Sequence, residues 1–264
     1  MQRFFLIFSM LFASFLYGVE GIVTPELLTL LEHFQLKHDG NLPSIVEVTQ
    51  RAWLRPHGKE RWEADDHFSG EDREAVLTYY LQTGKLNDKR PLKKVYQAGA
   101  ICGSTTDSMK NRIHFLEQLV KGGLQVREIV LLSGSRALDP KIDRLLEGCM
   151  TEGDAFMALW KVSDLYSKNV WKHLDHPMIA LENGSYRRPN TYDTFLLWQQ
   201  TNPQGPVLII TDQPYCCYFE AVAQWAFPRG FEYEVVGKGV SPESQTTSIL
   251  LDNLARWIYV TSKH

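Results

Sequence analysis

The chain has 264 residues, of which 44% are hydrophobic and 22% are charged, and its formal net charge is -3. This composition is typical of a soluble chain that can bury one sizeable core. It shows none of the strongly basic character that nucleic-acid binding requires, so no nucleic-acid partner is expected. The short basic stretches at 85–94 and 187–188 are expected to be solvated loops.

Residues 4–19 form an uncharged apolar run that follows Arg3. The run is shorter than the ~20 residues of a spanning helix, and the small residues Gly18 and Gly21 offer cleavage positions. We therefore expect residues 1–21 to be a signal peptide and the mature protein to be periplasmic or secreted. The alternative is an uncleaved run that anchors the protein in the inner membrane, which would then be its only membrane contact.

Residues 22–91 are predicted to be a small helical segment in front of the main domain. Thr24 is a good N-cap residue, and Pro25 suits the first position of the helix that follows. A second helix is expected to begin at Ser44. A third is expected to begin at Ser69, where acidic residues follow in the first turn.

From residue 92 onward, apolar runs typical of buried strands alternate with stretches of helical spacing. This alternation predicts a Rossmann-like α/β domain over 92–264, a three-layer sandwich with a mostly parallel five-stranded sheet. Its strands are predicted at 95–101, 126–132, 177–181, 207–210 and 233–236. Its helices are predicted at 109–120, 142–150, 152–167, 191–200, 215–227 and within 241–260.

The chain has four cysteines, at positions 102, 149, 216 and 217. An exported chain could pair them, and the adjacency of Cys216 and Cys217 makes a partner elsewhere, such as Cys102, more plausible than a bridge between neighbours. Buried unpaired thiols that pack as small apolar groups are the alternative. The sequence does not choose between these arrangements.

Polar segments follow two of the predicted strands directly. Residues 133–136 combine two serines, a glycine and Arg136, and residues 211–217 come between the most apolar strand and a helix. Glycine lets a ligand approach the backbone, hydroxyls donate hydrogen bonds, and arginine can clamp a carboxylate or phosphate. Ligands of parallel sheets bind outside the carboxyl ends of the strands, so we expect a pocket there. A tight turn with Arg136 facing solvent is the alternative.

The order of these features resembles the SanA/YdcF/ElyC-like family, a bacterial Rossmann-like group largely of cell-envelope proteins. The resemblance covers about residues 92–236. It implies one pocket lined by a serine-glycine turn, an acidic residue at a helix start, an asparagine-threonine pair and a threonine at a strand end. With their neighbours, the ligand-binding positions expected here are Ser133, Gly134, Ser135, Arg136, Glu182, Asn190, Thr191, Asp193, Thr211, Asp212 and Tyr215. Glu152 matches the acidic residue and is the expected catalytic acid or base.

Two departures from the family bear on chemistry. Tyr215 and Tyr218 stand where the family has a histidine and an arginine. Tyrosine supplies neither a permanent positive charge nor an imidazole that titrates near neutral pH. Arg136, Arg187 or Arg188 is expected to provide the anion clamp instead.

These features predict an exported, envelope-associated protein that binds a small anionic or nucleotide-like ligand and acts on a cell-envelope precursor. The alternative is a noncatalytic binding or scaffold protein that has lost the family's histidine and arginine. No Gly-x-Gly-x-x-Gly follows the first strand, so a dinucleotide-dependent dehydrogenase is not expected, and the cofactor stays open. His173 and His176 have a spacing that can bind metal, but we predict structural roles for them and no metal site.

Overall fold

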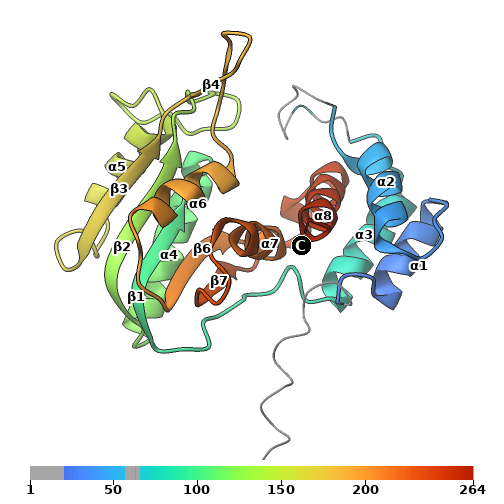
Figure 1. Cartoon of the computed structure of the whole chain (residues 1–264), viewed down its shortest axis with the longest axis horizontal. Coiled ribbons are helices and arrows are strands. Elements are labelled where there is room, and N and C mark those ends of the chain that lie inside the picture. The colour runs from blue at the N-terminus through green and yellow to red at the C-terminus, as the bar shows by residue number, and fades with distance from the viewer. Residues whose placement is uncertain (1–20, 57–62, 64–65, 264) are drawn as a thin grey trace, which may run out of the picture.

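The computed structural model describes residues 21–56, 63 and 66–263. Its centre is a five-stranded sheet in the order β3-β2-β1-β6-β7, and every pairing in it is parallel (Figure 1). The predicted Rossmann-like α/β fold is therefore confirmed. The strands are β1 (Val95–Cys102), β2 (Gln125–Gly134), β3 (Val170–His176), β6 (Val207–Asp212) and β7 (Tyr233–Lys238).

The sheet has one switch point, where successive strands stop being added on one side of β1 and begin to be added on its other side. From β1 the chain proceeds to β2 and β3 on one side, and it then crosses over to β6 and β7 on the other side. The neighbours at this switch are β1 and β6, which pair through Ile101 and Ile210 near their carboxyl ends. The loops that leave these two strands diverge, and such a divergence leaves a crevice between them.

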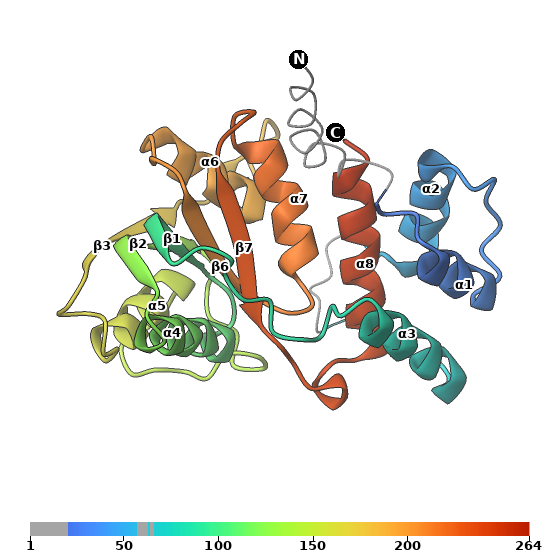
Figure 2. The same cartoon turned by 90° about the horizontal axis from the view of Figure 1, so that it is seen from below.

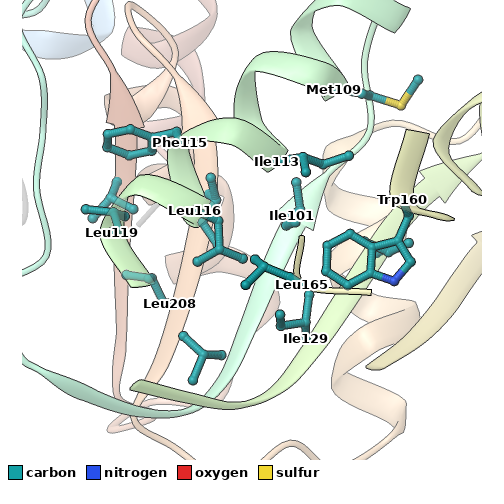
Figure 3. Packing of buried hydrophobic residues seen from close by; sticks show 14 of the residues in the cluster. Ile101, Met109, Ile113, Phe115, Leu116, Leu119, Ile129, Trp160, Leu165 and Leu208 are labelled. Carbon is teal, nitrogen blue, oxygen red and sulfur yellow. The ribbon is translucent and has the colours of Figure 1, made fainter. Parts of the chain in front are cut away.

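Helices cover both faces of the sheet. One face carries α4 (Thr106–Lys121) and α5 (Glu152–Lys161), and the other carries α6 (Thr191–Gln200) and α7 (Cys216–Ala226) (Figure 1). Figure 3 shows the packing on the α4 side, where Leu116, Ile101 and Trp160 belong to one apolar cluster. Each of these side chains is fully buried. The two apolar layers hold the strand ends rigidly in place.

A second group of helices packs beyond α7. It consists of α1 (Pro25–His33), α2 (Leu42–Trp53) and α3 (Gly70–Gln82) together with the C-terminal helix α8 (Thr247–Thr261). Figure 2 shows α8 between α7 and the three N-terminal helices, so this one helix touches both parts of the molecule. Its buried leucines share an apolar cluster with the N-terminal helices.

The predicted helix starts at Thr24 and Ser69 are confirmed, and Ser69 forms a capping box with Asp72. The start predicted at Ser44 is wrong, since α2 begins at Leu42 with Asn41 as its N-cap. The Asn41 side chain accepts the amide hydrogen bond of Ser44, and the proline in the first turn has no amide proton to satisfy.

The third strand was predicted at the wrong place. The sheet uses Val170–His176, whereas the predicted segment 177–181 contributes only β4 (Ile179–Ala180), which pairs with β5 (Tyr186–Arg187) in a separate hairpin. The real strand lies at the edge of the sheet and is only partly buried. It therefore lacks the continuous aliphatic run by which buried strands are recognised.

The helix predicted at 142–150 is also wrong, because this stretch is a chain of turns. The carboxylate of Asp143 accepts hydrogen bonds from the amides of Asp139 and Thr106, which holds the segment in a loop. The next predicted helix is present but shorter, since α5 ends at Lys161 instead of 167.

All four cysteines are free thiols, and Cys102 and Cys216 are buried. Within the part of the chain that the structure describes, no helix is long and apolar enough to cross a membrane. Residues 1–20 of the expected signal peptide lie outside the described residues.

Truncation of a core residue of α8 should weaken the contact between the two groups of helices. Leu254 is 1% exposed and belongs to the cluster that α8 shares with the N-terminal helices. Leu254→Ala should lower the free energy of unfolding by about 2–5 kcal/mol in a urea titration. Leu92→Ala, at a position that is 91% exposed, should change it by less than about 0.5 kcal/mol. Equal effects of the two substitutions would contradict this packing.

Candidate functional site

A cavity of about 260 Å³ opens at the carboxyl ends of the strands, where β1 and β6 diverge. Its walls come from the loops after β1 and β2, the start of α5, the start of α6, the start of α7, and the helix group of α2 and α8. The described residues that line it are Arg55, Cys102, Gly103, Ser104, Thr105, Arg112, Leu132, Gly134, Arg136, Glu152, Arg188, Pro189, Asn190, Thr191, Thr194, Tyr215, Tyr218, Phe219 and Arg256. Five of these are arginines, and one is a carboxylate.

Arg112 projects from α4 to the floor of the cavity and is 2% exposed. Its Nε donates to Oδ2 of Asp212 at 2.8 Å, and its Nη1 donates to the carbonyls of Cys102 and Gly103 at 2.7 and 2.9 Å. The remaining Nη2 has no hydrogen-bond partner among the described residues. A nearly buried guanidinium is thus anchored on one side, and its other amino group is left without an acceptor among the described residues.

The helix α7 begins beside this guanidinium. Its N-cap residue, Tyr215, makes no capping hydrogen bond with its side chain, whereas α4 and α6 are capped by Thr105 and Asn190. Tyr215 and Tyr218, in the first turn of α7, both line the cavity. The amides and the dipole at an uncapped helix start favour a negative charge there.

Arg136 reaches the cavity from the loop after β2. Its Nη1 and Nη2 donate to the two carboxylate oxygens of Asp143 at 2.6 and 3.0 Å, and its Nε donates to Glu152 at 3.2 Å. Burial alone would raise the pKa of Asp143, but the hydrogen bonds and the charge of Arg136, together with the Asp139 amide, outweigh burial and lower that pKa below its ordinary value. Arg136 was expected to clamp a ligand. In the structure its guanidinium instead donates to two carboxylates of the protein itself.

Glu152 is buried at the N-terminal end of α5 and accepts the amide hydrogen bond of Gly134 at 3.2 Å. Burial raises the pKa of Glu152, and the positive charge of Arg136 lowers it by less. A carboxyl group with a raised pKa in a cavity is a candidate proton donor or acceptor. Gly103 lies so close to it that an added methyl group would collide with the carboxylate.

Another wall of the cavity carries two further arginines, Arg55 and Arg256, which are both anchored by the same carboxylate. Asp252 on α8 is 1% exposed, and it accepts hydrogen bonds from Nη1 of Arg55 at 3.1 Å and from Nε of Arg256 at 2.9 Å. Both arginines line the cavity. Neither terminal amino group of Arg256 has a hydrogen-bond partner among the described residues.

The structure brings together part of the predicted site. The predicted residues that line the cavity are Gly134, Arg136, Glu152, Asn190, Thr191 and Tyr215. The predicted residues that do not line it are Ser133, Ser135, Glu182, Asp193, Thr211 and Asp212. Of the arginines named as replacement clamps, Arg188 lines the cavity, whereas Arg187 pairs with Asp193.

Ser133 belongs to a network between β2 and β3. Its hydroxyl donates to Oδ1 of Asp175 at 2.7 Å, and Nε2 of His173 lies 2.7 Å from the Ser133 hydroxyl oxygen. A hydroxyl has one proton and an ionised carboxylate only accepts, so the histidine donates to Ser133 and cannot act as its base. Burial lowers the pKa of His173, and Asp175 opposes that change. This geometry holds the strand ends together and does not activate a nucleophile.

The other predicted residues outside the cavity have local roles. Asp193 closes the capping box of α6 and Asp212 anchors Arg112, so both position lining residues. Ser135 bonds the carbonyl of His176. Glu182 is exposed in the turn between β4 and β5, in a hairpin that projects from the body in Figure 1. Thr211 is fully buried within β6.

Several lining residues were missing from the predicted site. Arg112 could have been found, because it interrupts the apolar stripe of its helix, and a charge on a buried face needs an internal partner. Arg55 and Arg256 gave no such signal. They lie about 200 residues apart in the chain and meet only because α8 packs against α2.

Comparisons with protein-family models, with curated proteins and with solved structures found no match for this chain. Function therefore rests on the geometry and chemistry of the cavity. Among the described residues, no group of three or more histidine, cysteine, aspartate and glutamate side chains is placed to hold a metal ion. The thiol that lines the cavity belongs to Cys102, and burial raises its pKa to about 12, so it stays protonated at neutral pH.

Glu152 should make the stability of the protein depend on pH. Its pKa in the folded state is raised above the ordinary value of 4.5, so folding favours the protonated form. The wild type should therefore lose free energy of unfolding relative to Glu152→Gln as the pH rises from 4 to 8. Urea titrations at several pH values measure the difference, with Glu182→Gln on the exposed hairpin as control. A difference that stays constant with pH would show that the carboxyl group is not perturbed.

A methyl group at position 103 should disturb the site from within. The added carbon would lie 2.8 Å from the carbonyl oxygen of Leu132 and closer still to Glu152. Gly103→Ala should therefore lower the free energy of unfolding by about 1–3 kcal/mol in a urea titration. Gly70→Ala is the matched control, since nothing lies within 4 Å of its added carbon. A stable Gly103→Ala protein would contradict the close approach of Glu152.

Proposed function

We propose that this protein binds a small anionic or nucleotide-like ligand in the cavity at the carboxyl ends of β1 and β6. The observation that carries the proposal is Arg112, a nearly buried guanidinium at the cavity floor, one amino group of which has no partner in the described part of the chain. Burying a charged group is costly unless it is paired, and leaving a donor of that group open is a further cost. An anion that accepts from this donor accounts for the arrangement.

The surroundings of Arg112 support the same class of ligand. The start of α7 has no side-chain cap, and five of the described lining residues are arginines. Ser104 and Thr191 also line the cavity, and neither hydroxyl is hydrogen-bonded to a residue that the structure describes. Hydroxyls, backbone amides and guanidinium groups are the donors by which proteins hold phosphate and carboxylate groups.

The size and the aromatic residues of the cavity narrow the ligand further. A volume of about 260 Å³ is slightly below the range of pockets that hold drug-sized molecules, so the bound part of the ligand is small. Tyr215, Tyr218 and Phe219 add aromatic rings to one wall. Such rings can stack on a planar base, which is why a nucleotide-like ligand belongs to the proposal.

Glu152 is the residue that would perform acid-base chemistry on this ligand. Its raised pKa and its place in the cavity favour that role, and action on a cell-envelope precursor is the reaction class we propose. The noncatalytic alternative has its own support, since no histidine is found among the described lining residues. Loss of turnover with retained binding in Glu152→Gln would favour the enzyme, and binding without any turnover in the wild type would favour the alternative.

The resemblance to the SanA/YdcF/ElyC-like family adds export to the proposal. An exported chain would function at the cell envelope, where a precursor of that compartment would be its ligand. Mass spectrometry of the chain recovered from the periplasmic fraction would test whether the N-terminal signal peptide is cleaved. A mature chain that begins at residue 19 or 22 supports export and cleavage, whereas an intact chain in the cytoplasmic fraction contradicts it.

Removal of the anchored guanidinium should abolish anion binding. Isothermal titration calorimetry with phosphate, pyrophosphate, AMP and ATP tests the wild type first. The double variant Arg112→Gln with Asp212→Asn removes the cation without leaving a buried carboxylate unpaired, and it should bind at least about tenfold more weakly. Lys110→Gln is the control, because Lys110 is exposed on the same helix.

Two outcomes would overturn the proposed function. The wild type could bind none of the four probes, or the folded double variant could bind them as tightly as the wild type does. The melting temperature of each variant, measured without ligand, shows whether the variant is folded. A variant that does not fold is replaced by Arg112→Lys, which keeps the charge but loses the fork and should also bind more weakly.

A further inference from the structure

We infer that the ligand carries two anionic groups, one bound by Arg112 at the strand ends and one bound by Arg256 on α8. This inference rests on the proposed function and deepens it. It names the ligand class as bis-anionic, with diphosphates as the simplest members. It also assigns α8, which lies outside the sheet and its two covering layers, a direct part in binding.

The two arginines are held in the same manner on different parts of the molecule. Nε of Arg112 donates to the buried Asp212 at 2.8 Å, and Nε of Arg256 donates to the buried Asp252 at 2.9 Å. An arginine anchored through Nε has a fixed plane and presents its terminal amino groups outward. Arg112 keeps one such group unpartnered and Arg256 keeps two, counted against the described residues.

Both arginines line the same cavity, although they come from elements on opposite sides of α7. Arg112 lies on α4, which packs on the first face of the sheet. Arg256 lies on α8, which packs against α7 on its outer side (Figure 2). A cavity of about 260 Å³ has room for several water molecules, so a lone oxyanion at Arg112 would leave most of it to solvent.

Asp252 acts as the positioning residue of the second group. It is 1% exposed, and besides Arg256 it accepts a hydrogen bond from the backbone amide of Arg55 at 3.2 Å. A buried carboxylate that binds a side chain of α8 and the loop after α2 fixes both against the cavity wall. Hydrogen bonds that include two from guanidinium groups offset the cost of burying it.

The test compares two probes that differ in the number of anionic groups. Calorimetric titrations measure the affinities of the full chain for pyrophosphate and for inorganic phosphate. The wild type should bind pyrophosphate at least about tenfold more tightly. In Arg256→Gln the ratio should fall to near one, while the affinity for phosphate should stay within about twofold.

Two further variants control for the loss of a surface charge and for misfolding. Arg51→Gln removes an exposed arginine of α2 that pairs with Glu47, and it should preserve the wild-type ratio. Arg256→Lys keeps the charge and loses the planar fork, so it should lower the ratio even if Arg256→Gln fails to fold. Equal affinities of the wild type for the two probes, or an unchanged ratio in the folded Arg256 variants, would overturn the inference and leave the proposed function standing. Failure of the wild type to bind either of these two probes would overturn the inference, and the proposed function would fall with it only if AMP and ATP also failed to bind.

Discussion

The buried ion pair between Arg112 and Asp212 connects the fold to its site. Asp212 ends β6, Arg112 lies on α4, and the guanidinium also binds the carbonyls that end β1. One side chain thus joins the carboxyl ends of β1 and β6, the two strands at the switch point of the sheet. A pair of apolar residues would fill this space at lower cost. The ion pair provides what they could not, a positive charge with an open donor at the floor of a cavity.

The helices outside the sandwich complete the site as well as the core. The apolar cluster shared by α8 and the N-terminal helices holds α8 in place, and α8 positions Asp252 and the two arginines that it binds at the cavity wall. Packing and the shape of the cavity are therefore coupled, because loosening of this cluster would also move a wall of the cavity.

Glu152 is buried in the cavity at a cost to stability, as expected if the residue serves the proposed function. Its carboxyl group is held by the amide of Gly134 and by Arg136, in a place so crowded that only glycine fits at position 103. Burial raises its pKa, so the charged form destabilises the folded protein at neutral pH. Buried groups with such a penalty are found at functional sites more often than elsewhere. The ligand would meet Glu152 and Arg112 on the same side of the sheet.

The sequence by itself determined the parts of this protein that depend on neighbours in the chain. The caps at Thr24, Ser69 and Asn190 and the buried runs of β1, β2 and β6 follow from hydrogen bonds and apolar spacing within a few residues. The edge strand β3 was missed because its partly exposed residues carry no continuous apolar signal. Only the tertiary structure decided which charged groups share the cavity, because Arg55 and Arg256 meet through the packing of α8 against α2. Local patterns specify elements, whereas a site built from distant segments depends on how those elements pack.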